Sequence, residues 1–337
     1  MASSKTLLLA ALLALGPMIS EVCADQRKTV YMAVWRGCEE ACKSFIKYFS
    51  DNDKKIDFII RDADRDKAKL ELFVAEIRAG KPDLVVTWGT SVSKRILGPW
   101  RQPDPDKYIT DIPAVFMIVA DPVGAKISKN AQNSGRPNVT GTLNRASAKT
   151  QIQTIQQYRP IKTIGMVYND NELNSRLSVE GMKEAAKSQN IALIEERIQN
   201  DKFGKPRVED IQAAVVRIAK KRPDFLYLGS SSFLTKFRTE FSQAAFQAGL
   251  PVAAGSEVPV RKAGALLGVA AKYSSIGRLA ALQAEEILFR GKKAGNLTIK
   301  ELKRYSVLIN IDSARRLGLY PPLSLLKISE IVGQSLP

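Results

Sequence analysis

The sequence predicts an α/β protein made of two doubly wound lobes, each containing a parallel sheet. Three observations support this fold class. The chain has 337 residues, enough for two domains of ordinary size. Short, almost continuously apolar runs alternate with amphipathic segments, which is typical of parallel strands covered by helices on both faces. The alternation occurs as two consecutive series, which favours two open lobes over a single barrel of eight units.

The first series runs from residue 30 to residue 143. Its first strand is expected at residues 30–35, where β-branched and aromatic residues gather. A helix at 38–49 follows, with apolar residues at the helical spacing of Ala41, Phe45 and Phe49. The other expected elements are strands at 56–60, 83–88, 114–120 and 139–143, and helices at 68–79 and 91–97.

The second series repeats the same alternation after a helix at 148–158, which Pro160 ends. A long helix at 276–289 is expected to present an apolar stripe of Leu279, Leu282, Ala284 and Ile287. The other expected elements are strands at 163–168, 192–196, 225–228, 251–254, 265–270 and 305–311, and helices at 178–189, 208–220, 234–248 and 313–317.

The composition excludes several classes of enzyme. Without any histidine, the chain cannot form a Ser-His-Asp triad, a Cys-His pair or a histidine-ligated metal site. No dinucleotide or phosphate-loop motif follows a strand. We therefore expect a protein that is not an enzyme and needs no cofactor or metal.

The chain carries a net charge of +17, with Lys and Arg spread along the predicted helices. No nucleic-acid-binding motif accompanies this charge, so we expect a solvated basic surface and no nucleic-acid partner. Attraction to an anionic membrane surface or to acidic ligands is the alternative.

Residues 1–24 are predicted to be a signal peptide. Lys5 precedes an apolar run at 7–15, and Val22-Cys23-Ala24 is a small-residue pattern that signal peptidase cuts, here after Ala24. The run is too short to span a membrane, and no later stretch of similar hydrophobicity reaches that length. We therefore expect an exported, periplasmic chain that does not span the membrane. Lipidation of Cys23 is the alternative, although Glu21 and Val22 depart from a lipobox.

Cys38 and Cys42 are the cysteines that remain after cleavage. An oxidising compartment favours a disulfide between them. On a regular helix, their Cα atoms would lie about 6 Å apart, within the range of a disulfide but requiring a distorted first turn. A redox-active pair is the alternative, although such pairs usually have two intervening residues.

The loops beyond the carboxyl ends of the strands are the expected ligand site, because helix N-termini converge there in open parallel sheets. Most polar side chains in these loops are uncharged hydrogen-bonding groups, which bind ligands rather than react with them. These are Thr90, Ser91, Ser93, Asn169, Asn171, Asn174, Ser175, Ser230, Ser231 and Ser232.

Two tryptophans and two carboxylates belong to the same region. Trp35 and Trp88 end their strands, where they could stack on a planar ligand or serve as ordinary core residues. Asp121 and Glu257 could accept hydrogen bonds from a ligand ammonium. Asp121 could instead stabilise a turn, because it begins an Asp-Pro-Val-Gly sequence.

The motifs in these loops resemble the ABC-transporter substrate-binding proteins of the tryptophan/tyrosine type. The resemblance covers nearly the whole chain after the signal peptide. It rests on Pro-Asp-Leu-Val-Val-Thr-Trp-Gly-Thr at 82–90, Asp-Pro-Val-Gly at 121–124, Asn-Val-Thr-Gly at 138–141, Ile-Gly-Met-Val-Tyr-Asn at 164–169, and Asn174-Ser175.

This resemblance implies a periplasmic binding protein-like I fold, whose lobes are joined by a three-crossover hinge and close on a ligand. The N-terminal lobe would comprise 25–143 with 272–296 returning to it, and the C-terminal lobe 144–271 with 297–337 returning to it. The cleft roles of the family fall on Gly89, Thr90, Asp121, Asn144, Asn169, Asn174, Ser175, Ser230 and Glu257. Ser230-Ser231-Ser232 stands where the family commonly has Thr-Asp-Asn, which removes a carboxylate expected to meet a ligand ammonium.

We expect a monomeric solute-binding protein that delivers a small organic molecule to an inner-membrane ABC permease. This molecule would be amino-acid-like, or carry an aromatic or carboxylate group. A periplasmic sensor read by a membrane kinase or cyclase is the main alternative, because it would have the same fold. An enzyme using Asp121 and Glu257 as acid and base, or a DNA-bound repressor of this fold, has less support.

Overall fold

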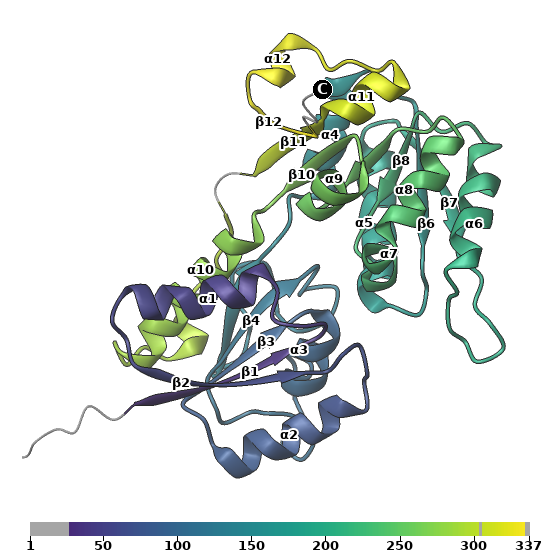
Figure 1. Ribbon diagram of the computed structural model, residues 1–337. Helices are drawn as coiled ribbons and strands as arrows, with labels where there is room; N and C mark the ends of the chain where they lie inside the picture. Colours follow the sequence, from purple (N-terminus) through teal and green to yellow (C-terminus); the bar gives the residue numbers. More distant parts are fainter. Residues whose placement is uncertain (1–26, 303–304, 334–337) are drawn as a thin grey trace, which may run out of the picture.

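The computed structural model describes residues 27–302 and 305–333. The chain forms two α/β lobes, each built around its own sheet (Figure 1). The predicted fold class is therefore confirmed. The expected signal peptide and its cleavage after Ala24 lie outside the described residues. Within these residues, no helix combines the length and the apolar character needed to cross a bilayer.

The first lobe contains a five-stranded parallel sheet of order β2-β1-β3-β4-β5. Its central strands are fully buried, because helices cover both faces. The strands are β1 (Lys28–Val34), β2 (Ile56–Asp62), β3 (Leu84–Trp88), β4 (Ala114–Val119) and β5 (Val139–Leu143). The helices are α1 (Glu40–Asp51), α2 (Lys69–Gly80), α3 (Thr90–Leu97) and the returning α10 (Tyr273–Leu288).

The second lobe contains a seven-stranded sheet of order β12-β11-β10-β9-β8-β6-β7. Its strands are β6 (Thr163–Tyr168), β7 (Ala192–Arg197), β8 (Phe225–Leu228), β9 (Val252–Ala254), β10 (Leu267–Ala270), β11 (Ser306–Asn310) and β12 (Ser329–Val332). Its helices are α4 (Ala148–Tyr158), α5 (Leu173–Ser188), α6 (Glu209–Ala219), α7 (Ser232–Lys236), α8 (Arg238–Gln247), α9 (Glu257–Ala263), α11 (Ile311–Leu317) and α12 (Leu323–Leu326).

One pairing in the second sheet departs from the parallel arrangement that the sequence predicts. β11 runs antiparallel to β10, while the other pairs are parallel. The chain reaches β11 from the first lobe, so no right-handed β-α-β crossover within the second lobe sets its direction.

The chain passes between the lobes between β5 and α4, between β10 and α10, and between η1 (Ala294–Asn296) and β11. Figure 1 shows α10 lying against α1 in the first lobe, although β10 and β11 belong to the second. Thr142 of β5 forms a parallel bridge with Lys300. The third crossing therefore falls beyond Lys300, later than the expected boundary at 296.

The buried face of α10 differs from the predicted apolar stripe. Leu282 is 42% exposed, so it does not belong to the core. The face that packs inward consists mainly of small residues, because α1 approaches closely there. It comprises Ile276, Gly277, Ala280, Ala281, Ala284 and Ile287. A pattern search for large apolar side chains misses such a helix contact.

Short elements account for most other differences. The predicted helix at 234–248 is two helices, α7 and α8, which meet at Phe237. The sequence predicts no helix between the strands expected at 251–254 and 265–270, where α9 lies, and neither α12 nor β12 was predicted. Elements of one or two turns have too few residues for a periodic pattern.

Cys38 and Cys42 are joined by a disulfide, with Cα atoms 5.1 Å apart. Cys38 lies in the loop before α1, whereas Cys42 lies in its first turns. The bond therefore connects a loop to a helix, and the expected distortion of a helical turn is not needed.

Candidate functional site

A cavity lies between the lobes, at the carboxyl ends of the strands. Its lining comes from both lobes and from two of the segments that connect them. The lining residues are Trp35, Arg36, Trp88, Gly89, Thr90, Ser91, Ile118, Ala120, Asn144, Arg145, Asn174, Ser230, Ser231, Ser232, Thr235, Ser256 and Tyr273. This central cavity has a volume of about 60 Å³. It holds a functional group rather than a whole metabolite, since ligand pockets usually measure about 300–1,000 Å³.

Two wider cavities flank the central one. A cavity of about 490 Å³ shares Ala120, Asn144 and Arg145 with it, and continues along α4 and α5. Another, of about 470 Å³, shares Trp35, Thr90, Ser91 and Ser232 with it. Because they share wall residues, the three cavities adjoin one another in the cleft, and each of the two wider ones has the volume of a site for a small organic molecule.

Gly89 places the start of α3 at the central cavity. Its φ of +96° with ψ of 155° is a conformation that favours glycine, and it is the N-cap residue. No side chain caps α3. The first-turn N–H groups of a helix lack intrahelical partners, so those of α3 are available to a ligand acceptor.

An irregularity in β4 shapes the same wall. The pairing of β4 with β5 shifts register between Phe116 and Val119. Ile118, between them, has a φ of +55°, which is rare for a β-branched residue. This bulge turns the end of β4 so that Ile118 lines the central cavity. Backbone strain of this kind is typical of binding and active sites.

The sequence left open whether the two tryptophans are core residues or belong to the ligand site, and each has both positions. Trp35 and Trp88 belong to the buried core of the first lobe and also line the central cavity. The Nε1 atom of Trp88 is buried and has no hydrogen-bond partner. The guanidinium of Arg36 lies over the Trp88 ring, 5.2 Å from its centroid.

Neutral hydrogen-bonding groups face the cavity from both lobes. The Oγ1 of Thr90 accepts a hydrogen bond of 3.4 Å from the N–H of Ala120 and retains its own proton for donation. The Nδ2 of Asn174 donates to the carbonyl of Ser230, at 3.2 Å, and to a carboxylate oxygen of Glu172, at 3.4 Å. The Oδ1 of Asn144 is buried without a partner. Protein contacts therefore orient Thr90 and Asn174. The Oδ1 of Asn144 lacks a partner, which a ligand could supply.

Six predicted site residues do not line the central cavity. Ser93 shares a buried hydrogen bond with the hydroxyl of Thr87, and Asn171 lines the 470 Å³ cavity. Ser175 is buried, and its Oγ accepts a hydrogen bond from the N–H of Asn169. The Oδ1 of Asn169 in turn accepts one from the N–H of Asn171. The Oδ1 of Asp121 accepts from the N–H of Gly124 at 2.8 Å, so Asp121 has the turn contact considered above, although it lines the 490 Å³ cavity. Glu257 pairs with a neighbouring arginine on α9. Their side chains turn away because local hydrogen bonds orient them.

Three residues that were not predicted as site residues, Arg36, Arg145 and Tyr273, also line the central cavity. Burial raises the pKa of the Tyr273 phenol, and the charges of Arg36 and Arg145 oppose that rise, so the three side chains are close enough to interact. The chain has 51 Lys and Arg residues, so residue type alone did not distinguish these two arginines from the others. Their position directly after Trp35 and Asn144 was the available signal.

Two α/β lobes connected by three chain crossings, with a polar cleft at the strand ends, define a two-lobe ligand-binding protein. The family model described as ABC transporter substrate binding protein matches residues 34–332. The chain belongs to this family, whose members bind substrates and do not transform them.

Relatives and solved structures agree with this membership. The chain is 26% identical over 288 residues to a tyrosine-binding protein of Clostridioides difficile, covering 83% of this chain and 77% of that protein. A conserved domain protein from Vibrio cholerae has a similar fold, with a TM-score of 0.78, 24% identity and coverage of 91% of this chain and 100% of that chain. An ABC domain from Streptococcus pneumonia in complex with L-Trp gives a TM-score of 0.75 and 20% identity, covering 90% and 99%.

We expect Gly89→Ala to lower the free energy of unfolding by about 1–3 kcal/mol, because alanine is strained at this positive φ. Urea unfolding of both proteins measures the difference. Gly80→Ala is the control, since an added Cβ there meets no atom within 4 Å and the backbone has no positive φ. A loss of stability equal in the two variants would contradict the role of the Gly89 backbone.

Proposed function

We propose that this protein is the exported solute-binding component of an ABC importer. In this role it captures a small organic molecule between its lobes and presents it to an inner-membrane permease. The observation that carries the proposal is the cleft itself, in which neutral donors and tryptophans from strand ends of both lobes surround a shared cavity. Such a site binds and releases its ligand without covalent chemistry.

Different parts of the cleft suit different parts of the ligand. Thr90, Asn174 and the start of α3 hold an acceptor-rich group such as a carboxylate. Trp35 and Trp88 cover a planar or apolar part. The tyrosine-binding relative and the L-Trp complex support an aromatic ligand of amino-acid size.

Hinge closure is part of the proposal. Of the described residues, we assign 27–143 with 272–302 to the first lobe, and 144–271 with 305–333 to the second. Asn144 and Arg145 follow the end of β5, and Tyr273 begins α10, so all three lie where the chain crosses between the lobes. A ligand that contacts them together with Thr90 and Asn174 would stabilise the closed arrangement.

A periplasmic location fits the Cys38–Cys42 disulfide, because such bonds persist in oxidising compartments. Export would follow from the signal peptide predicted at residues 1–24.

Thermal unfolding of the mature protein with a ligand panel tests the proposal. The panel contains aromatic and aliphatic amino acids, the corresponding carboxylic acids, purines and sugars. A ligand at about 100 times its dissociation constant adds about 2.7 kcal/mol, enough to raise the melting temperature by several degrees. We expect a selective shift for one chemical class, and the absence of a shift for every compound would contradict the proposal.

Variants then locate the site. Thr90→Val combined with Asn174→Ala is expected to weaken binding of the active compound by about tenfold or more, since two hydrogen bonds are lost. Ser188→Ala, at the far end of α5, is the control. Calorimetric titration measures the three dissociation constants, and an unchanged constant in the double variant would remove these residues from the site.

A further inference from the structure

We propose that the cleft prefers an organic carboxylate without an ammonium group over the corresponding amino acid, and that Arg145 is the residue that makes this choice. The favoured ligand class is an aromatic acid, above all a 2-hydroxy acid. The inference rests on the proposed function and specifies its ligand. It starts from the charges in the central cavity.

The central cavity has cationic side chains and no anionic one in its wall. Arg36 and Arg145 line it, whereas none of its lining residues is Asp or Glu. An amino acid brings a carboxylate and an ammonium on the same carbon, so its site needs an acceptor for the ammonium as well as donors for the carboxylate. This wall supplies charged partners for a carboxylate alone.

Arg145 is the cation whose charge lacks a partner. Among the described residues, no carboxylate lies within ion-pair distance of its guanidinium and no side-chain hydrogen bond fixes it. Its Nη2 atom lies beside Gly255, 3.4 Å from the position that a Cβ would occupy there. The residue lines both the central cavity and the 490 Å³ cavity. An anionic ligand in the cleft would give this guanidinium the partner that the protein does not.

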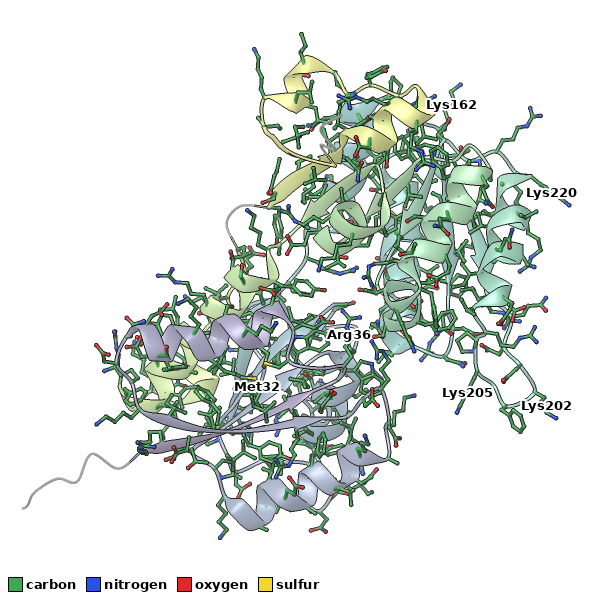
Figure 2. The ribbon with its side chains drawn as sticks, in the orientation of Figure 1. Met32, Arg36, Lys162, Lys202, Lys205 and Lys220 are labelled. Carbon is green, nitrogen blue, oxygen red and sulfur yellow. A yellow bond between two sulfur atoms is a disulfide. The ribbon has the colours of Figure 1, made fainter. Side chains whose placement is uncertain are left out.

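Arg36 has a different role, because protein contacts already hold it. Its Nε and Nη2 atoms donate to the two carboxylate oxygens of Glu39, at 2.9 and 3.2 Å, and its side chain is only 7% exposed. Stacking on Trp88 fixes the plane of the guanidinium. Figure 2 shows Arg36 at the side of the first lobe that faces the second. Arg36 thus presents a fixed donor edge, while Glu39 balances its charge.

The carboxylates nearest to the central cavity are engaged by the protein. Glu172 accepts the N–H groups of Ser232 and Phe233, at 2.5 and 2.8 Å, and so caps α7. Glu257 pairs with Arg261 at 3.0 Å and accepts the N–H of Tyr273.

The other acids of the cleft lie outside the central cavity. Asp121 and Glu301 line the 490 Å³ cavity, which Arg145 also borders, and Glu71 and Glu172 line the 470 Å³ cavity, where Glu71 pairs with Arg95. The turn to Gly124 occupies one oxygen of Asp121. In the central cavity itself, Ser230, Ser231 and Ser232 supply hydroxyl and backbone groups in place of a carboxylate.

Two buried groups without partners refine the ligand class. The Nε1–H of Trp88, a residue only 3% exposed, is a donor suited to a carboxylate oxygen. The Oδ1 of Asn144 is an acceptor, and a hydroxyl group satisfies it without adding charge. A 2-hydroxy acid offers both groups on neighbouring atoms.

Calorimetric titration with matched sets of compounds tests the inference. The sets are L-phenylalanine, 3-phenyllactate, 3-phenylpropionate and 3-phenylpropionamide, together with L-tryptophan, indole-3-lactate, indole-3-propionate and its amide. We expect a hydroxy acid to bind about tenfold or more tightly than its amino acid and its neutral amide. An amino acid that binds as tightly as its hydroxy acid would overturn the inference and leave the proposed function intact. No binding of any compound in these sets or in the panel would contradict the proposed function itself.

Variants separate the role of Arg145 from general electrostatics. Arg145→Gln is expected to weaken binding of the preferred acid by about tenfold or more and to leave the affinity for the neutral amide nearly unchanged. Lys205→Gln removes the same charge from the outer loop of the second lobe, seen in Figure 2, and is expected to change neither affinity. Arg145→Lys, which keeps the charge, should recover part of the affinity.

The melting temperature of each free variant shows whether it remains folded. If Arg145→Gln does not fold, the comparison of acid, amide and amino acid in the unmodified protein still decides the ligand class. Equal losses for acid and amide in a folded Arg145→Gln protein would assign Arg145 a structural role and overturn its part in the choice.

Discussion

Replacing Gly277 with alanine is expected to lower the free energy of unfolding by about 3 kcal/mol, because the new methyl group would overlap with backbone atoms of α1. A Cβ at this position meets the carbonyl oxygen of Ala41 and the side chain of Ser44. The Oγ of Ser44 also donates a hydrogen bond of 2.6 Å to the carbonyl of Ser274, which the displacement would lengthen. α1 has little freedom to move away, since Phe45 and Phe49 anchor it in the core.

The matched control is Gly181→Ala, in the middle of α5. An added Cβ there meets no atom within 4 Å, so alanine is expected to raise stability by about 0.5–1 kcal/mol through its higher helix propensity. Urea unfolding of the two variants and the parent protein measures both effects. Similar stability in the two variants would show that the contact between α1 and α10 tolerates a methyl group.

Arg136→Met is the second variant with a large expected effect, a loss of about 3 kcal/mol in unfolding free energy. Arg136 is only 4% exposed and donates to the carbonyl oxygens of Leu97 and Ile109, the latter at 2.8 Å. Burial lowers its pKa to about 10, so the guanidinium remains charged at neutral pH. Leu97 ends α3, where the helix dipole favours a cation. Methionine would remove the side-chain donor of the Leu97 carbonyl and leave the Ile109 carbonyl with only the longer hydrogen bond from the Nδ2 of Asn138, at 3.4 Å.

Arg197→Met provides the comparison, because Arg197 is an exposed arginine paired with Asp170 and surface pairs contribute little. Thermal and urea unfolding are expected to separate the two variants clearly. Since the opposite end of α3 lines the central cavity, ligand affinity should fall in Arg136→Met as well. Indistinguishable stabilities would refute the structural role of the buried arginine.

Several elements were predictable from the sequence to the residue. β5, α4, β6 and β8 have the expected bounds. Local chemistry explains α4 in particular, since the Ser147 side chain accepts the N–H of Thr150 at its start and Pro160 follows its end. By contrast, α5 begins at Leu173 rather than at 178. Its first turn is polar apart from Leu173 and Leu177, and this i, i+4 pair, which packs against the core of the first lobe, was the signal that the sequence prediction missed.

The candidate site was predictable at the level of loops. The strand-end rule indicated the regions around Trp35, Trp88, Thr90 and Ser230, and these residues line one cavity. The rule does not give the direction of a side chain within its loop. The side chain of Asp121, for example, accepts a hydrogen bond from the N–H of Gly124. This turn contact was one of the two roles that the Asp-Pro-Val-Gly motif allowed.

The sequence by itself determined the class of fold and the polar, non-catalytic character of the strand-end loops, because both depend on residue types and on spacing along the chain. The tertiary structure alone decided which charges meet. Arg36 forms an ion pair with Glu39 across a short turn. Arg145, which follows β5, lines the same cavity and has no pairing carboxylate among the described residues. Whether a carboxylate lies beside Arg145 depends on distances between residues far apart in the chain, and only packing sets those distances.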